Sequence, residues 1–111
     1  MSRENHEIAV TVTFRHVEST PALKQYAEEK ITHSLQKFIN HETSVHIILA
    51  IEKDDHIAEA KFHSKVYDIF GKAVTGDLYS SIDKLVDNLE SQLRKQKDRI
   101  ANHKHQPASQ Y

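Results

Sequence analysis

The sequence predicts an α+β domain of order β-α-β-β-β-α, a four-stranded sheet with two helices packed on one face. Three observations predict it. Four segments alternate apolar and polar residues with the period of two that is typical of strands. Two longer segments repeat apolar residues at spacings of three and four, as amphipathic helices do. The length of 111 residues provides for one domain with one core.

The first strand is expected over residues 7–14. Ile8, Val10, Val12 and Phe14 would share one face, with Ala and Thr residues on the other. Both the alternation and the β-branched content favour a strand with one buried face.

The first helix is expected over residues 21–39. Thr20 is a suitable N-cap, and Pro21 fits the first helical position because a proline there loses no intrahelical hydrogen bond. An apolar stripe follows at spacings of four and three, made of Leu23, Ala27, Ile31, Leu35 and Phe38.

The three remaining strands are expected over residues 44–52, 57–64 and about 66–75. The polar run Lys53–His56 would form the first turn, and the second would fall within Ser64–Asp68, which lacks an Asn-Gly pair. Gly71 interrupts the last strand, and a glycine there indicates a bulge or a kink.

The second helix is expected from Leu78 to about residue 102, with Asp77 as its N-cap. A single domain would therefore cover residues 1–102, and residues 103–111 would form a flexible polar tail. The apolar stripe of this helix consists of Leu78, Ile82, Leu85, Val86, Leu89, Leu93 and Ile100.

Composition argues against several classes of protein. Without cysteine the chain has neither a disulfide framework nor a thiolate metal site. With two glycines and no nucleophile motif it offers no phosphate-binding loop and no catalytic centre, so we expect no enzyme activity and no cofactor. The nine histidines are scattered, and His46 and His63, possible cross-strand neighbours, would make a weak metal site at best. No signal peptide or membrane-spanning run is evident, which favours a cytoplasmic protein.

Charge is distributed unevenly along the chain. The net charge is −1, yet residues 94–105 contain five basic residues and one acidic residue. Two Lys-rich stripes are expected on the helices. One runs along the last helix through Lys84, Asn88, Ser91, Lys95 and Arg99, and the other along the first helix through Tyr26, Lys30, His33 and Lys37. Two packed helices with such stripes would cradle a phosphate backbone, whereas the simpler alternative is a pair of solubilising surfaces.

Two stretches resemble the ribosome hibernation promoting factor family, which includes the ribosome-associated inhibitors and sigma 54 modulation proteins. The first is Val17–Lys24. The second is Gly76–Arg99, which opens with Asp-Leu-Tyr-x-x-Ile-Asp-x-Leu and continues with Gln-Leu-x-Lys-x-Lys-Asp. The resemblance covers about residues 7–100 and implies a fold like that of double-stranded-RNA-binding domains.

The resemblance also implies a function. Such proteins lodge in the decoding channel of the small ribosomal subunit, overlap the positions of mRNA and tRNA, and stop translation in stationary phase or stress. It implies that Lys30, Lys95, Lys97 and Arg99 bind rRNA. Asn88 and Ser91 replace residues that are usually basic in the family, and we expect Lys84 and Arg94 to compensate. Secondary candidates for RNA binding are Tyr26, His33 and Lys37.

The tail indicates the subtype. Ala101–Tyr111 is too short for a dimerisation domain and contains no acidic residue, so the chain is similar to the short form of the family. We expect a monomer when the protein is free, and ribosome pairing that depends on a separate modulation factor. Two alternatives stay open, a general double-stranded-RNA binder and a protein-interaction module that uses the open sheet face.

Overall fold

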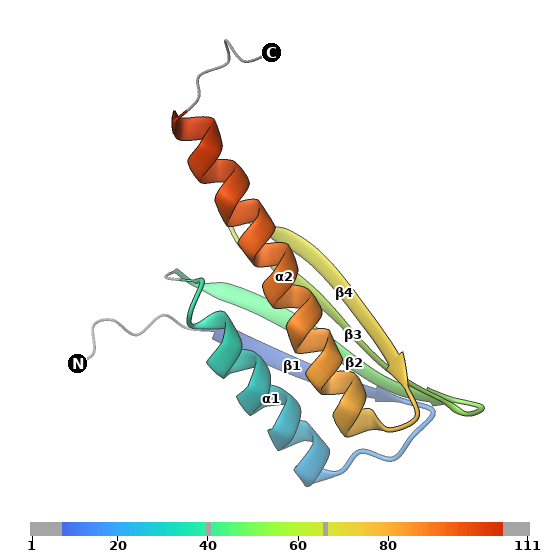
Figure 1. Cartoon of the computed structure of the whole chain (residues 1–111). Helices are drawn as coiled ribbons and strands as arrows, with labels where there is room; N and C mark the ends of the chain where they lie inside the picture. The colour runs from blue at the N-terminus through green and yellow to red at the C-terminus, as the bar shows by residue number, and fades with distance from the viewer. Residues whose placement is uncertain (1–7, 40, 66, 106–111) are drawn as a thin grey trace.

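The elements follow the predicted order along the chain. The computed structural model describes residues 8–39, 41–65 and 67–105, with side chains described as far as residue 98. The elements are β1 (Ile8–Arg15), α1 (Pro21–Leu35), β2 (Thr43–Glu52), β3 (Asp55–His63), β4 (Asp68–Thr75) and α2 (Leu78–His105), as Figure 1 shows.

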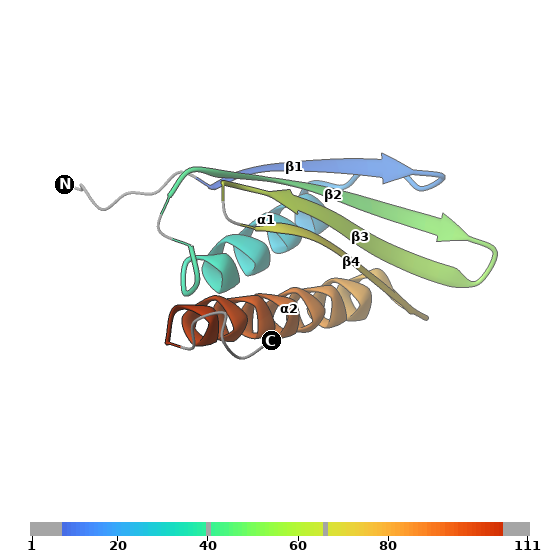
Figure 2. The ribbon, with the colours of Figure 1, turned by 90° about the horizontal axis from the view of Figure 1, so that it is seen from above.

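The sheet is mixed, with its strands in sequence order. β1 lies parallel to β2 and is joined to it through α1, whereas β2, β3 and β4 form an antiparallel meander. Both helices cover the same face of the sheet, and the opposite face is open (Figure 2). The predicted fold class is therefore confirmed.

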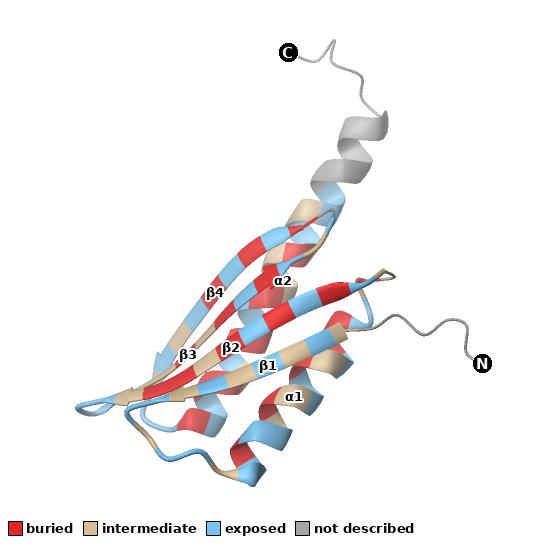
Figure 3. Cartoon of the chain, turned by 180° about the vertical axis from the view of Figure 1, so that it is seen from behind, coloured by how far each residue is buried: buried red, intermediate tan, exposed pale blue. Residues whose placement is uncertain are grey.

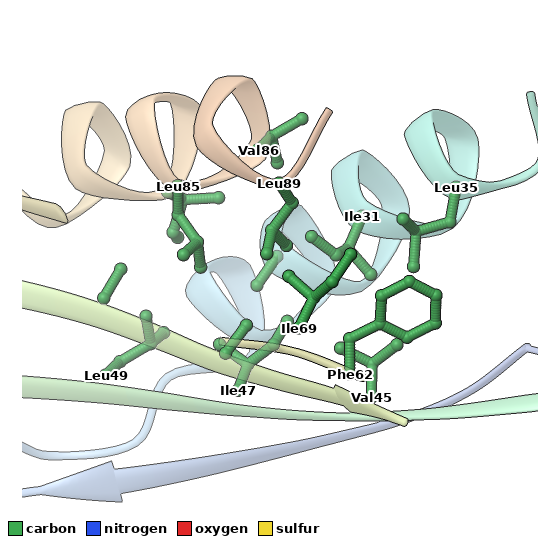
Figure 4. Packing of buried hydrophobic residues seen from close by; sticks show 14 of the residues in the cluster. Ile31, Leu35, Val45, Ile47, Leu49, Phe62, Ile69, Leu85, Val86 and Leu89 are labelled. Carbon is green, nitrogen blue, oxygen red and sulfur yellow. The ribbon is translucent and has the colours of Figure 1, made fainter. Parts of the chain in front are cut away.

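One core fills the space between the helices and the sheet. Buried and exposed residues alternate along β2 and β3, as the coloured strands in Figure 3 show. Phe62 of β3 is fully buried and lies opposite Val45 of β2. Leucine and isoleucine side chains of both helices point down onto this layer, among them Ile31, Leu35, Leu85 and Leu89 (Figure 4).

Both predicted helix caps are confirmed. The Thr20 hydroxyl accepts a hydrogen bond from the Leu23 amide at 3.2 Å. The Asp77 carboxylate accepts hydrogen bonds from the amides of Tyr79 (3.3 Å) and Ser80 (3.0 Å). These side chains satisfy amides that have no partner within the helix.

The far ends of the helices differ from the prediction. α1 ends at Leu35, and a turn over residues 36–38 carries the chain on to the buried Ile39. α2 continues to His105, so the predicted boundary at residue 102 falls inside the helix, and the remainder of the expected tail, residues 106–111, lies outside the described residues. None of the described helices is both long and apolar enough to cross a membrane.

The prediction of a bulge at Gly71 is wrong. The pairing of β3 with β4 runs without interruption from His56–Thr75 to His63–Asp68, and Gly71 pairs with Ala60 within it. A Cβ atom on Gly71 would lie 2.8 Å from a methyl carbon of Leu89 in α2. Glycine is therefore needed because helix and strand approach closely here, and not because an extra residue interrupts the pairing.

Candidate nucleic-acid interface

The two helices lie side by side and run in the same direction along the sheet (Figure 1). Their facing surfaces are joined by polar side chains. Lys30 of α1 lies with its ammonium nitrogen 3.5 Å from a carboxylate oxygen of Asp83 in α2. The Tyr26 hydroxyl donates a hydrogen bond of 2.6 Å to the same carboxylate. We call this group, Tyr26, Lys30 and Asp83, the Asp83 bridge.

A second group of the same kind lies two helical turns further along. The Ser34 hydroxyl donates a 2.5 Å hydrogen bond to the Glu90 carboxylate, and the Lys37 ammonium donates one of 3.3 Å. Arg94, one turn beyond Glu90 on α2, places a guanidinium nitrogen 3.5 Å from the other carboxylate oxygen. We call the group Ser34, Lys37, Glu90 and Arg94 the Glu90 bridge.

These bridges change the interpretation of the stripe predicted on α1. Lys30 in α1 and Lys37 in the turn after it are seven residues apart, as are their partners Asp83 and Glu90 in α2, so the two lysines face carboxylates at the same spacing. Lys30 and Lys37 of this stripe therefore face the acidic flank of α2, where each is paired with a carboxylate. His33 lies apart from the bridges, beside Glu28 and Glu29 in a shallow hollow on the outer side of α1.

Three other predicted cations lie on α2 outside the bridges. Lys84, Lys95 and Lys97 are exposed on α2 and have no acidic partner among the residues that the structure describes. Lys84 and Lys95 are on the side of the helix that faces away from the core. Arg99 belongs to α2, but its side chain lies outside the described part of the chain.

The bridges also shift two pKa values. The hydrogen bond to Asp83 raises the pKa of the Tyr26 hydroxyl, and burial and the charge of Asp83 act in the same direction. The hydrogen bond from Ser34 lowers the pKa of the Glu90 carboxyl, helped by Lys37 and Arg94 and opposed by burial. At neutral pH the Tyr26 hydroxyl is therefore protonated and the Glu90 carboxyl is charged.

Sequence reasoning missed the part that Tyr79 has in this interface. Its ring meets that of Tyr26 edge to face, with 4.9 Å between the ring centroids. Lys30 also lies 5.7 Å from the centroid of the Tyr26 ring. Tyr79 and Asp83, two residues of the sequence motif, thus anchor the first turns of α2 to α1. The sequence indicates this role only once the two helices are known to be neighbours.

The open sheet face contains Lys61 and Lys72, of which Lys72 lies opposite Glu59. Its exposed apolar side chains are Phe70 and Val74 of β4, at 53% and 46% exposure. His46 and His63 share this face but are not opposite each other, because His46 pairs with Lys61 and His63 with Ser44. Within the described residues, no three histidine or acidic side chains form a group suited to a metal ion.

Comparison of the sequence with known proteins finds one matching family and several relatives. Residues 10–101 match the family described as sigma 54 modulation protein / S30EA ribosomal protein. A ribosome hibernation promoting factor of Klebsiella oxytoca is 35% identical over 94 residues, which are 85% of this chain and 98% of the relative. Another, from Azotobacter vinelandii, is 34% identical over 90 residues, 81% of this chain and 83% of the relative.

Solved structures resemble the fold as well. A ribosomal subunit interface protein from Coxiella burnetii superimposes with a TM-score of 0.71 at 29% identity, covering 81% of this chain and 98% of the other. The N-terminal domain of protein Y from Thermus thermophilus gives a TM-score of 0.70 at 25% identity, covering 80% and 97%. The similarity therefore extends over nearly the whole of each of these structures.

Proposed function

The chain belongs to the family of sigma 54 modulation proteins and S30EA ribosomal proteins, and on this premise we propose that it is a ribosome hibernation factor. It binds the small ribosomal subunit through rRNA, blocks translation, and is not an enzyme. Relatives named ribosome hibernation promoting factor support the proposal, and one of them aligns with this chain over 98% of its own length.

The observation that carries the proposal is the set of unpaired cations on α2. Lys84, Lys95 and Lys97 are exposed and, among the described residues, have no acidic side chain to neutralise them. Such lysines bind phosphates and release the counterions condensed on the nucleic acid, which makes binding favourable even for a chain whose net charge is −1. The binding surface is thus local and does not depend on the overall charge.

The proposed mode of action is competition for the decoding channel. With the cationic surface of α2 on rRNA, the domain occupies the channel where mRNA and tRNA bind, so that they are excluded while the protein is present. The protein acts as a monomer in the cytoplasm, and pairing of ribosomes depends on a separate modulation factor.

Sedimentation of the purified protein with small subunits on sucrose gradients tests this proposal. We expect co-sedimentation at low salt and inhibition of translation in a cell-free assay. The affinity should fall with a log-log slope of roughly −0.7 to −0.9 for each phosphate neutralised. An affinity that does not change with salt would contradict the proposal, and equal affinity for free duplex RNA would favour a general double-stranded-RNA binder.

A further inference from the structure

The Glu90 bridge differs from an ordinary surface ion pair in how its members are exposed. The Glu90 side chain is only 15% exposed, whereas Lys37 and Arg94 are 55% and 63% exposed. The carboxylate therefore lies below the surface between the helices, and the two cations extend over it into solvent.

Several contacts hold this arrangement in place. Ser34, itself buried, donates its hydroxyl hydrogen to the Glu90 oxygen that also accepts from Lys37. Arg94 binds the other oxygen, and its guanidinium carbon lies 5.7 Å from the centroid of the Phe38 ring. The side chains of Lys37 and Arg94 are thus restrained before any ligand arrives. This lowers the conformational entropy that they lose when they bind a ligand.

Neither cation uses all of its hydrogen-bond donors on Glu90. An ammonium group has three donors and a guanidinium group has five. One carboxylate cannot satisfy all of these donors, and both groups are more than half exposed. Among the described residues the bridge therefore has one uncompensated positive charge, and its donors, from α2 and from the turn after α1, surround a single point.

The Asp83 bridge is a useful contrast. It holds one cation, Lys30, against one carboxylate, with Tyr26 as the second donor, so its formal charges cancel. In each bridge a lysine and a hydroxyl group bind one carboxylate, but only the Glu90 bridge contains two cations. Its excess charge is the property expected of an anion site.

We propose that Glu90 is a positioning residue that holds Lys37 and Arg94 as a preformed two-cation site for one phosphate group of RNA. The inference rests on the proposed function for the identity of the RNA, but the site itself is formed by α2 and the turn that follows α1. In this arrangement the partly buried carboxylate strengthens RNA binding, although it is an anion beneath a surface that binds anions.

Charge-neutralising variants test this inference. If only net charge mattered, removal of a negative charge would strengthen binding to RNA, whereas the inference predicts that removal of the Glu90 charge weakens it. Glu90→Gln can still accept the Ser34 hydrogen bond but no longer holds the two cations. We expect its affinity for small ribosomal subunits to fall roughly fivefold or more, since two long side chains must then be ordered on binding. The matched control is Asp87→Asn, which makes the same change of charge at an exposed position of α2 with no cation partner among the described residues. We expect this control to bind as tightly as the unmodified protein or slightly more tightly.

A second readout separates this inference from the proposed function. Inorganic pyrophosphate is titrated into each variant while NMR follows the Arg94 side-chain Nε–H signal. We expect a saturable shift in the unmodified protein and in Asp87→Asn, and a weaker response in Glu90→Gln whose thermal unfolding shows it to be folded. Glu90-dependent binding of pyrophosphate without binding to subunits would support the site and reject the function. Equal affinities of Glu90→Gln and Asp87→Asn for subunits, or no saturable shift in the unmodified protein, would overturn the inference.

Discussion

The two glycines of the chain provide a test of the packing between α2 and the sheet, because alanine should have opposite effects at the two positions. A Cβ atom at Gly71 would lie 2.8 Å from Leu89 Cδ2, 3.0 Å from Asn88 Oδ1 and 3.1 Å from Leu85 Cδ1. Both leucines are fully buried, so neither side chain can move aside without disturbing its other neighbours. At Gly76 an added Cβ would meet nothing within 4 Å.

The magnitude follows from these contacts. Overpacking of a filled core costs about 1–3 kcal/mol, and the reduced freedom of the unfolded chain returns about 0.4–1 kcal/mol. With both contributions at the middle of their ranges, Gly71→Ala should lower the free energy of unfolding by about 1.3 kcal/mol, and for a domain of this size that lowers the melting temperature by about 4–8 °C. Gly76→Ala, whose backbone has no positive φ, should be neutral or stabilising by up to about 1 kcal/mol.

Urea denaturation followed by circular dichroism measures both changes, with thermal melts as the second assay. Combining Gly71→Ala with Leu89→Ala gives a further check, because removing the nearest methyl groups should make the glycine substitution less costly in that background. If Gly71→Ala is as stable as the unmodified protein, the close approach of α2 to β4 is not what requires glycine, and the explanation given for its place in the strand fails.

Two further predictions concern the surface and the Asp83 bridge. Lys95→Glu combined with Arg99→Glu should abolish co-sedimentation with small subunits at a stability cost within about 0.5 kcal/mol. The control, Lys61→Glu with Lys72→Glu, makes the same charge reversal on the open sheet face and should bind normally. Equal loss of binding in both double variants would contradict the assignment of the binding surface to α2. The pKa of the Tyr26 hydroxyl is higher in the folded protein than in the unfolded chain, where it is near 10. The protonated hydroxyl therefore stabilises the fold at pH values below about 10, and this stabilisation is lost as the pH rises through the pKa of the folded protein. Tyr26→Phe should therefore be less stable than the unmodified protein at neutral pH by about 1 kcal/mol, and the difference should shrink in alkaline urea titrations; a constant difference would argue against the hydrogen bond as its cause.

The elements of this fold are encoded locally and were therefore predictable. The alternation in β2, the cap at Thr20 and the stripe that begins at Leu78 each depend on near neighbours in sequence. Gly71 was misinterpreted because a glycine in a strand has the same local signature whether the strand bends or a helix packs against it. Only the position of α2 distinguishes the two.

The candidate site was predicted less completely for a similar reason. Exposed lysines such as Lys95 follow from helical periodicity alone. The pairing of Lys30 with Asp83 and of Lys37 with Glu90 depends on two helices that run parallel in one register. The matching seven-residue spacings are visible in the sequence. They indicate a pairing of the two segments only once the β-α-β crossover sets the direction of α1 relative to α2.

The parallel pairing of β1 with β2 has a consequence for the order in which the molecule can be assembled. β1 is synthesised before β2, its neighbour in the described sheet, and α1 lies between the two strands in the sequence. The β2–β3–β4 meander closes through short turns at a small entropic cost. α2, which carries the unpaired lysines and one side of each bridge, is synthesised last among these elements. The surface proposed to bind rRNA is therefore finished only after the other elements have been translated.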